Sequence, residues 1–85
     1  ADSLNILGEV HQDLQEYDKA LTFFDQSYVM RKEIYGDTPH LEIAQSLFDL
    51  GVACYKLQDY KKSLEFHEKC YIMRTQIYGN TPRHE

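Results

Sequence analysis

The feature that most restricts the fold of this chain is an internal repeat with an offset of 43 residues. When residues 3–42 are aligned with residues 46–85, 19 of the 40 positions carry identical residues. Self-similarity at a period between about 20 and 50 residues is typical of arrays in which small structural units stack on one another. The chain is therefore predicted to hold two copies of one unit, repeat one at about residues 1–37 and repeat two at about residues 38–80.

Each unit is predicted to be a pair of helices, because its apolar residues recur at spacings of three and four rather than two. In the second unit this spacing predicts one helix from about residue 39 to 56 and another from residue 60 to near 79. The first unit follows the same plan, with a shorter helix over about residues 2–14 and a longer one over 17–35. We expect an all-α fold of two tandem helix-turn-helix repeats.

The residues between the predicted helices are typical of helix ends. Gly36 can adopt the left-handed conformation that ends a helix, Thr38 can cap the next helix with its hydroxyl, and Pro39 suits a first helical turn. Within the units, Glu16 and Asp59 stand where a carboxylate can cap the second helix and meet the positive end of its dipole. These residues predict a defined turn at each of the three helix junctions.

The small and apolar residues of the two units resemble the signature of the tetratricopeptide repeat family. Each unit holds a Leu-x-x-Leu-Gly run, at Leu4–Gly8 and Leu47–Gly51, followed by a small residue and a ring four positions apart, Ala20 and Phe24 or Ser63 and His67. The usual period of the family is about 34 residues, and the longer period here is similar to that of kinesin light chain units. Leu4 and Leu47 depart from the Trp of the family, and His11 and Cys54 from an aromatic residue. The resemblance implies a short right-handed α-solenoid that is a protein-binding scaffold and not an enzyme.

The resemblance also implies a concave groove, lined by the first helix of each unit, in which a peptide or protein segment lies. The matching positions are Asp2, Asn5, Glu9, Gln12 and Asp13 in the first unit, and Gln45, Phe48, Val52, Tyr55 and Lys56 in the second. The first set is acidic and the second largely apolar, so we expect a partner with basic and apolar residues. Glu9, Phe48 and Val52 break the Lys and Asn pattern with which chaperone-binding relatives hold terminal carboxylates. A second interpretation stays open, in which all these residues are ordinary solvent-facing positions.

The alternative function is that of a structural solenoid unit whose faces serve stacking or homo-oligomerisation. Arrays of this kind normally need at least about three units and a polar capping helix. We therefore expect the helix after Tyr60 to leave an apolar face open to helix exchange, to a second copy, or to the next repeat of a longer protein from which this single domain of residues 1–85 comes. Residues 1–42 hold nine acidic and three basic residues against five acidic and six basic in 43–85. That asymmetry either favours head-to-tail stacking or reflects solvated faces that differ by chance.

Other classes of function are disfavoured by composition. The net charge of −5 opposes nucleic acid binding, and no apolar run is long enough to span a membrane. The sequence shows no catalytic, phosphate-binding, cofactor or paired metal-ligand motif. We expect Cys54, Cys70, His11 and His67 to be core residues of a cytoplasmic protein in a reducing setting, without metal or cofactor. The tyrosines repeat in register and are expected to pack between helices.

Overall fold

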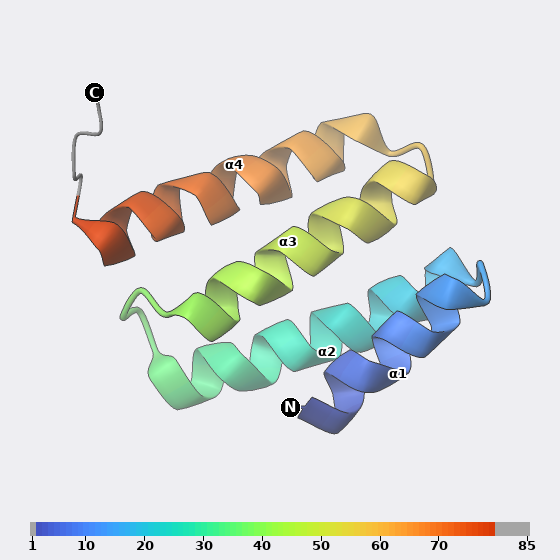
Figure 1. Cartoon of the computed structure of the whole chain (residues 1–85), viewed down its shortest axis with the longest axis horizontal. Helices are drawn as coiled ribbons and strands as arrows, with labels where there is room; N and C mark the ends of the chain where they lie inside the picture. Colours follow the sequence, from blue (N-terminus) through green and yellow to red (C-terminus); the bar gives the residue numbers. More distant parts are fainter. Residues whose placement is uncertain (1, 80–85) are drawn as a thin grey trace.

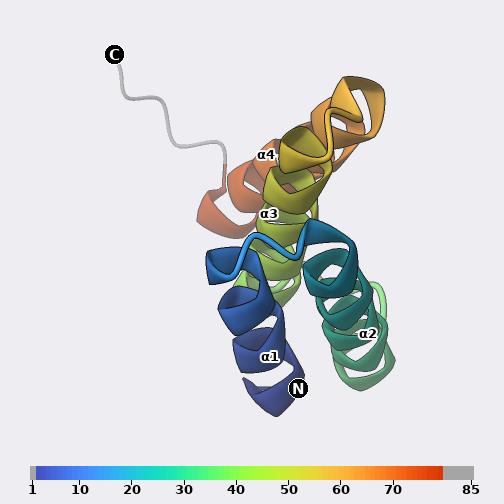
Figure 2. The same cartoon turned by 90° about the vertical axis from the view of Figure 1, so that its right-hand side faces the viewer.

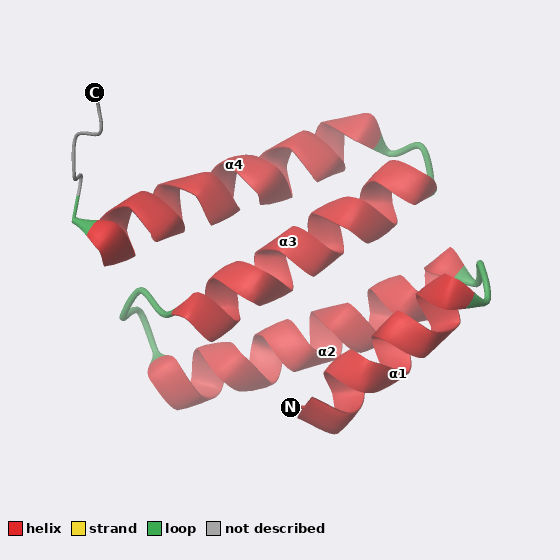
Figure 3. Ribbon diagram, in the orientation of Figure 1, coloured by secondary structure: helices red, strands yellow, loops and turns green. Residues whose placement is uncertain are grey.

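The computed structural model describes residues 2–79, with side chains from residue 3 onward. Four helices follow one another in this part of the chain: α1 (Asp2–Asp13), α2 (Tyr17–Tyr35), α3 (Leu41–Lys56) and α4 (Tyr60–Tyr78). Figure 3 shows them joined by short loops, with no strand between residues 2 and 79. The prediction of an all-α, helix-turn-helix repeat solenoid is confirmed. Thr81 and Pro82, which repeat the turn at Thr38 and Pro39, lie outside the described residues.

The helices stack in the order of the chain. α1 packs on α2, α2 on α3, and α3 on α4, and Figure 1 shows α2, α3 and α4 as successive rods that run back and forth. Figure 2 shows α1 and α2 side by side, with α3 and then α4 farther along the stack. The described chain measures 39 × 28 × 18 Å. Because a helix with its side chains is about 10–12 Å across, the thickness amounts to about two helix layers, and every helix keeps a face toward solvent.

The core lies on the two sides of α3. One buried cluster joins α2 to α3 and consists of Ala20, Phe24, Leu50 and Ala53. A second cluster joins α3 to α4 and consists of Ile43, Ala44, Leu47 and Cys70. Nine residues of α3 are buried against two of α4, so α3 is the central helix and α4 is covered on one side only. The expectation that Cys54 and Cys70 are core residues is confirmed, since both are buried.

Two glycines let the helices of each unit approach closely. A Cβ atom at Gly8 would lie 2.6 Å from the ring of Phe24 on α2. A Cβ atom at Gly51 would lie 2.6 Å from the ring of His67 on α4. Real Cβ contacts are not this short, so both helix pairs depend on the absence of a side chain at the crossing point.

The turn between α2 and α3 differs in part from the prediction. Gly36 has the expected positive φ of 63°, but its ψ of −136° lies outside the left-handed helical region. However, α3 begins at Leu41 and not at Pro39, and the cap is His40, whose Nδ1 accepts a hydrogen bond from the backbone N–H of Glu42 at 3.1 Å. The His40 ring also stacks on Tyr35 with a centroid distance of 3.6 Å. The prediction of Thr38 as cap was wrong because an imidazole nitrogen two residues later does the capping.

The turns within the two units use different chemistry. Asp59 caps α4 as predicted, because the backbone N–H of Lys62 donates to its carboxylate at 3.4 Å. Glu16 makes no side-chain cap hydrogen bond, and the prediction that it caps α2 was wrong. Its Oε1 instead lies 2.6 Å from Nδ1 of His11, and that hydrogen bond is the main reason why the pKa of Glu16 is lowered. The second unit has Cys54 in place of His11 and cannot form this contact.

The exposure of apolar residues differs strongly between equivalent positions. Leu50 is 1% exposed, whereas its counterpart Leu7 is 43% exposed. Tyr28 packs on both buried clusters, whereas its counterpart Tyr71 is 71% exposed. The expectation that all repeating tyrosines pack between helices was therefore wrong for those of α4. The reason is positional: α3 covers α2, and no described helix covers the corresponding face of α4.

Candidate functional site

The positions predicted to line a groove all lie on α1 and α3. The exposed ones among them are Glu9, Asp13, Gln45, Phe48, Tyr55 and Lys56, and the half-buried ones are Asn5, Gln12 and Val52. The backbone of Asp2 belongs to α1, but its side chain lies outside the described residues. The candidate site is thus a surface shared by the first helices of the two units.

Three predicted residues of this surface come together with one that the sequence did not single out, Asp49. On α1, the Asn5 amide donates a hydrogen bond to Glu9 at 3.2 Å. On α3, the Gln45 amide donates one to Oδ1 of Asp49 at 3.1 Å. The two pairs are neighbours, because the charge of Glu9 raises the pKa of Asp49 while the Asn5 amide lowers it. We call Asn5, Glu9, Gln45 and Asp49 the acceptor cluster.

Asp49 is the least ordinary member of the acceptor cluster. It is 9% exposed, and burial raises the pKa of its carboxyl group more strongly than the Gln45 hydrogen bond and the positive charge of Arg31 lower it. Its Oδ2 atom is buried and has no hydrogen-bond partner within residues 3–79, and the same is true of Oδ1 of Asn5. The cluster therefore holds buried oxygen atoms that form no hydrogen bond within residues 3–79, which is costly unless water or a ligand supplies the donor.

The sequence contains a signal for Asp49 in the comparison of the two units. The equivalent residue of the first unit is Ile6, so a carboxylate replaces an apolar side chain at one register position. Ile6 is 57% exposed on α1, whereas Asp49 is buried beside α1. A register position that is apolar and exposed in one unit but charged and buried in the other marks a place where the units have different surroundings.

The apolar part of the surface is partly fixed by α4. The ring of Phe48 packs edge-on against His67 with a centroid distance of 5.4 Å. The ring of Tyr55 packs in the same manner on Tyr60 at 5.2 Å. Phe48 and Tyr55 remain 43% and 59% exposed. Both rings are therefore positioned by contacts with α4 and still expose an apolar face to solvent.

The remaining predicted residues are not part of the acceptor cluster. Gln12 lies about two turns beyond Asn5 along α1, and its side-chain oxygen is another buried acceptor with no donor among the described side chains. Asp13 and Lys56 are the last residues of α1 and α3. The surface therefore divides into the acceptor cluster toward the N-terminal ends of α1 and α3 and a mixed polar and aromatic segment toward their C-terminal ends.

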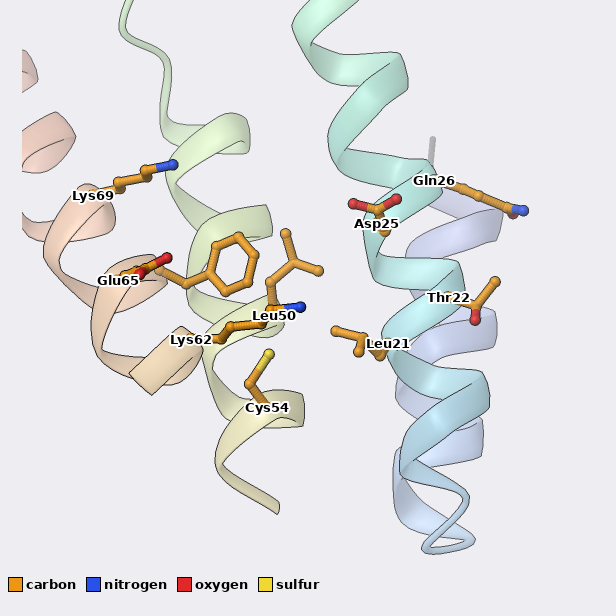
Figure 4. A pocket seen from close by; sticks show the side chains of 10 residues that line it. Leu21, Thr22, Asp25, Gln26, Leu50, Cys54, Lys62, Glu65 and Lys69 are labelled. Carbon is orange, nitrogen blue, oxygen red and sulfur yellow. The ribbon is translucent and has the colours of Figure 1, made fainter. Parts of the chain in front are cut away.

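A separate hollow of about 460 Å³ lies between α2 and α4. Figure 4 shows Leu50 and Cys54 of α3 between walls formed by Leu21 and Asp25 of α2 and by Lys62, Glu65 and Lys69 of α4. Burial raises the pKa of the Cys54 thiol, and the nearby charge of Asp59 adds to this effect. At neutral pH the thiol is therefore protonated and a poor nucleophile, so Cys54 gives this hollow no chemistry of its own.

Within the described residues, no group of three or more His, Cys, Asp or Glu side chains is placed to hold a metal ion. No helix of the described part of the chain has the length and apolar character needed to cross a bilayer.

The fold defines the class of the protein as a scaffold of stacked helix pairs. Comparison with family models identifies it more closely, because residues 1–76 match the tetratricopeptide repeat. The chain belongs to the tetratricopeptide repeat family, whose repeats generally mediate protein–protein interactions. Searches of curated proteins and of solved structures give no match. The narrower resemblance to kinesin light chain units stays a prediction.

Proposed function

We propose that this chain binds a peptide or protein segment along the exposed faces of α1 and α3, and that the acceptor cluster holds a basic side chain of that segment. The observation that carries the proposal is the buried Oδ2 of Asp49, which forms no hydrogen bond within residues 3–79 although the Asn5 amide lies near the carboxylate. A Lys or Arg side chain brings several N–H donors and a positive charge. Hydrogen bonds between a cation and a carboxylate are about twice as strong as neutral ones.

The neighbourhood of Asp49 supports a basic rather than an acidic ligand. Glu9 adds a second carboxylate, and Arg31, the nearby cation, already donates to Ser46 and to the carbonyl of Glu42. A ligand cation would offset both causes that raise the pKa of Asp49, first the burial of its carboxylate and then the repulsion from Glu9. An acidic ligand would add to it.

The residue before Asp49 on α3 supports an apolar contact beside the basic one. Phe48 precedes Asp49 and is 43% exposed, and Val52 is half-buried one turn further along. A segment that places an aliphatic or aromatic residue next to a Lys or Arg can satisfy both parts of the surface. In this function the chain is a scaffold and not an enzyme. The free, buried thiols of Cys54 and Cys70 support a cytoplasmic, reducing setting.

The experiment compares two fluorescent peptides of equal length, one with alternating Lys and Leu and one with Glu in place of every Lys. Fluorescence anisotropy should show binding of the basic peptide only. Asp49→Asn should weaken that binding by roughly tenfold or more, since a hydrogen bond to a charged group contributes about 1.5–3 kcal/mol. Phe48→Ala should weaken it independently. Asp25→Asn on α2 removes the same charge outside this surface and is the matched control.

Two results would contradict the proposal. One is equal binding of the acidic peptide. The other is an equal loss of affinity in the Asp49 and Asp25 variants, because it would reduce the effect to net charge.

A second candidate function, self-association through α4, is favoured by the open face of that helix. Leu64, Tyr71 and Ile72 are 60%, 71% and 53% exposed, and a shallow hollow of about 520 Å³ lies over His67, Glu68, Tyr71 and Ile72. Apolar residues gathered on one exposed face are typical of interaction surfaces. Sedimentation equilibrium over a wide concentration range tests this candidate, and a strictly monomeric chain would exclude it.

A further inference from the structure

The internal repeat allows the open face of α4 to be compared with an equivalent face that is covered. On α2 this face includes Leu21, Tyr28 and Arg31. Leu21 and Tyr28 pack against the buried clusters beneath α3. Arg31 is 5% exposed and donates hydrogen bonds to Oγ of Ser46 at 2.9 Å and to the carbonyl of Glu42 at 2.8 Å. α3 thus covers the face through apolar contacts and a buried guanidinium group.

The same residues recur on α4 at the repeat offset of 43, as Leu64, Tyr71 and Arg74. Leu64 and Tyr71 are 60% and 71% exposed, and Arg74 is exposed. The three side chains are identical to those of α2, so α4 carries the surface on which an α3-like helix packs.

α1 carries the other half of this contact. α3 covers α2 with Ser46, Leu50 and Ala53, which are 0%, 1% and 0% exposed. The equivalent residues of α1 are Ser3, Leu7 and Val10, of which the first two are identical to those of α3. Ser3 is exposed, and Leu7 and Val10 are 43% and 48% exposed. The face that α3 uses against α2 is therefore present on α1, and no other described helix covers it.

The charges of the two uncovered helices are opposite. α1 contains three acidic residues and neither Lys nor Arg. α4 contains four basic residues, Lys61, Lys62, Lys69 and Arg74, and two acidic ones, Glu65 and Glu68. Approach of α1 to α4 is therefore electrostatically favourable, whereas approach of two α4 helices is not.

We propose that α1 of a second copy of this chain docks on α4 in the place that α3 takes on α2, so that copies stack head to tail. In this register Ser3 of the second copy meets Arg74, as Ser46 meets Arg31, and Leu7 meets Leu64 and Tyr71. The proposal rests on the second candidate function and deepens it by naming both surfaces. The two surfaces differ, so the contact is heterologous and continues along a filament unless it is blocked.

The test uses two full-length variants that each block one surface. Val10→Glu places a charge on the α1 face, and Tyr71→Glu places one on the α4 face. Both positions are exposed in the single chain, so circular dichroism should show folded helices. Burying an unpaired charge costs several kcal/mol, so each variant alone should associate at least tenfold more weakly than the unchanged chain in sedimentation equilibrium.

Mixing the two variants gives the decisive result. Each retains the surface that the other lacks, so an equimolar mixture should form a one-to-one pair that does not grow further. Two acidic substitutions are chosen so that the altered faces cannot attract each other. Gln76→Glu is the matched control on α4, because it adds the same charge and its counterpart Glu33 remains exposed although α3 covers α2. It should associate as the unchanged chain does.

The outcomes separate this inference from the candidate function on which it rests. Suppose that the unchanged chain associates. If Val10→Glu by itself associates equally well, or if the mixture of the two variants forms no pair, the α1 to α4 contact is overturned while self-association stands. If the unchanged chain is monomeric at high concentration, both fail. Should either Glu variant be unfolded, Leu7→Gln and Leu64→Gln provide a milder pair with the same expected mixing result.

Discussion

At the scale of single residues, Gly8 and Gly51 occupy equivalent positions of the two repeats, but the aromatic rings that they contact differ in how freely they can move. Phe24, opposite Gly8, is 1% exposed and held inside the core, whereas His67, opposite Gly51, is half-buried. The His67 ring can turn toward solvent when a methyl group is added, and the Phe24 ring cannot.

We predict that Gly8→Ala lowers the free energy of unfolding by about 1–3 kcal/mol, the usual range for overpacking. Gly51→Ala should be close to neutral, because the displaced ring offsets a gain of about 1 kcal/mol in helix propensity. Urea denaturation of the two variants side by side checks this. Equal losses at both sites would mean that His67 is as rigid as Phe24.

We predict that the Asp49 carboxylate strengthens binding of the basic peptide and lowers the stability of the folded chain. Asp49→Asn keeps an acceptor for the Gln45 amide and removes the buried charge, so the melting temperature at neutral pH should rise by a few degrees while affinity for the basic peptide falls. Thermal melts and anisotropy on the same samples test both effects. A variant that melts lower than the unchanged chain would show that the carboxylate stabilises the fold.

The effect of Asp49→Asn is also predicted to depend on pH. Burial raises the pKa of Asp49, so the folded chain keeps this proton to a higher pH than the unfolded chain. The stability from the protonated group is therefore present below the ordinary pKa of an aspartate and is lost as the pH rises through the raised pKa. The advantage of the Asn variant should be full at neutral pH and shrink toward about pH 4. Denaturation of the unchanged chain and of Asp49→Asn over this pH range measures the difference in their free energies of unfolding. The other carboxylates contribute equally to both proteins and cancel in this difference.

At the scale of helices, the capping of α3 depends on one side chain with two contacts. His40 accepts the backbone hydrogen bond of Glu42 and stacks on Tyr35 at the end of α2. His40→Ala should remove both and destabilise the fold by about 1–3 kcal/mol, from about 0.5–2 for the cap and about 0.5–1.5 for the ring pair. His40→Asn keeps a capping oxygen and should cost about half as much. Chemical denaturation separates the two variants, and equal losses would assign the whole effect to the stack.

A helix end can be predicted from the sequence when the residues next to it determine where the helix stops or starts. The ends of α2 and α4 are predictable because Gly36 and Gly79 take positive φ. The start of α3 is not, because stacking on Tyr35 favours His40 over Thr38 as the cap. The candidate binding positions on α1 and α3 come from the resemblance and stay a prediction. Asp49 does not come from it, because its burial depends on how α1 lies beside α3.

At the scale of the whole molecule, the first and last helices differ from the middle two in what covers them. α3 packs closely on both of its neighbours, whereas α1 and α4 each pack closely on one described helix, and α1 meets α3 only beside Asp49. Equivalent residues such as Leu50 and Leu7 then have opposite environments despite identical chemistry. The repeat therefore sets the shape of each contact, and the place of a helix among the four described ones sets which of its faces are covered there.

The charges on the open helices lead to a prediction about salt. If association joins acidic α1 to basic α4, raising sodium chloride from about 0.05 M to about 0.5 M should weaken it several-fold, because the Debye length falls well below the dimensions of the interface. If two α4 faces met instead, their like charges would be screened and association would strengthen. Sedimentation equilibrium at the two salt concentrations reports the sign directly. Gln76→Glu should keep the same sign of salt dependence as the unchanged chain, because the α1 to α4 contact is intact in it.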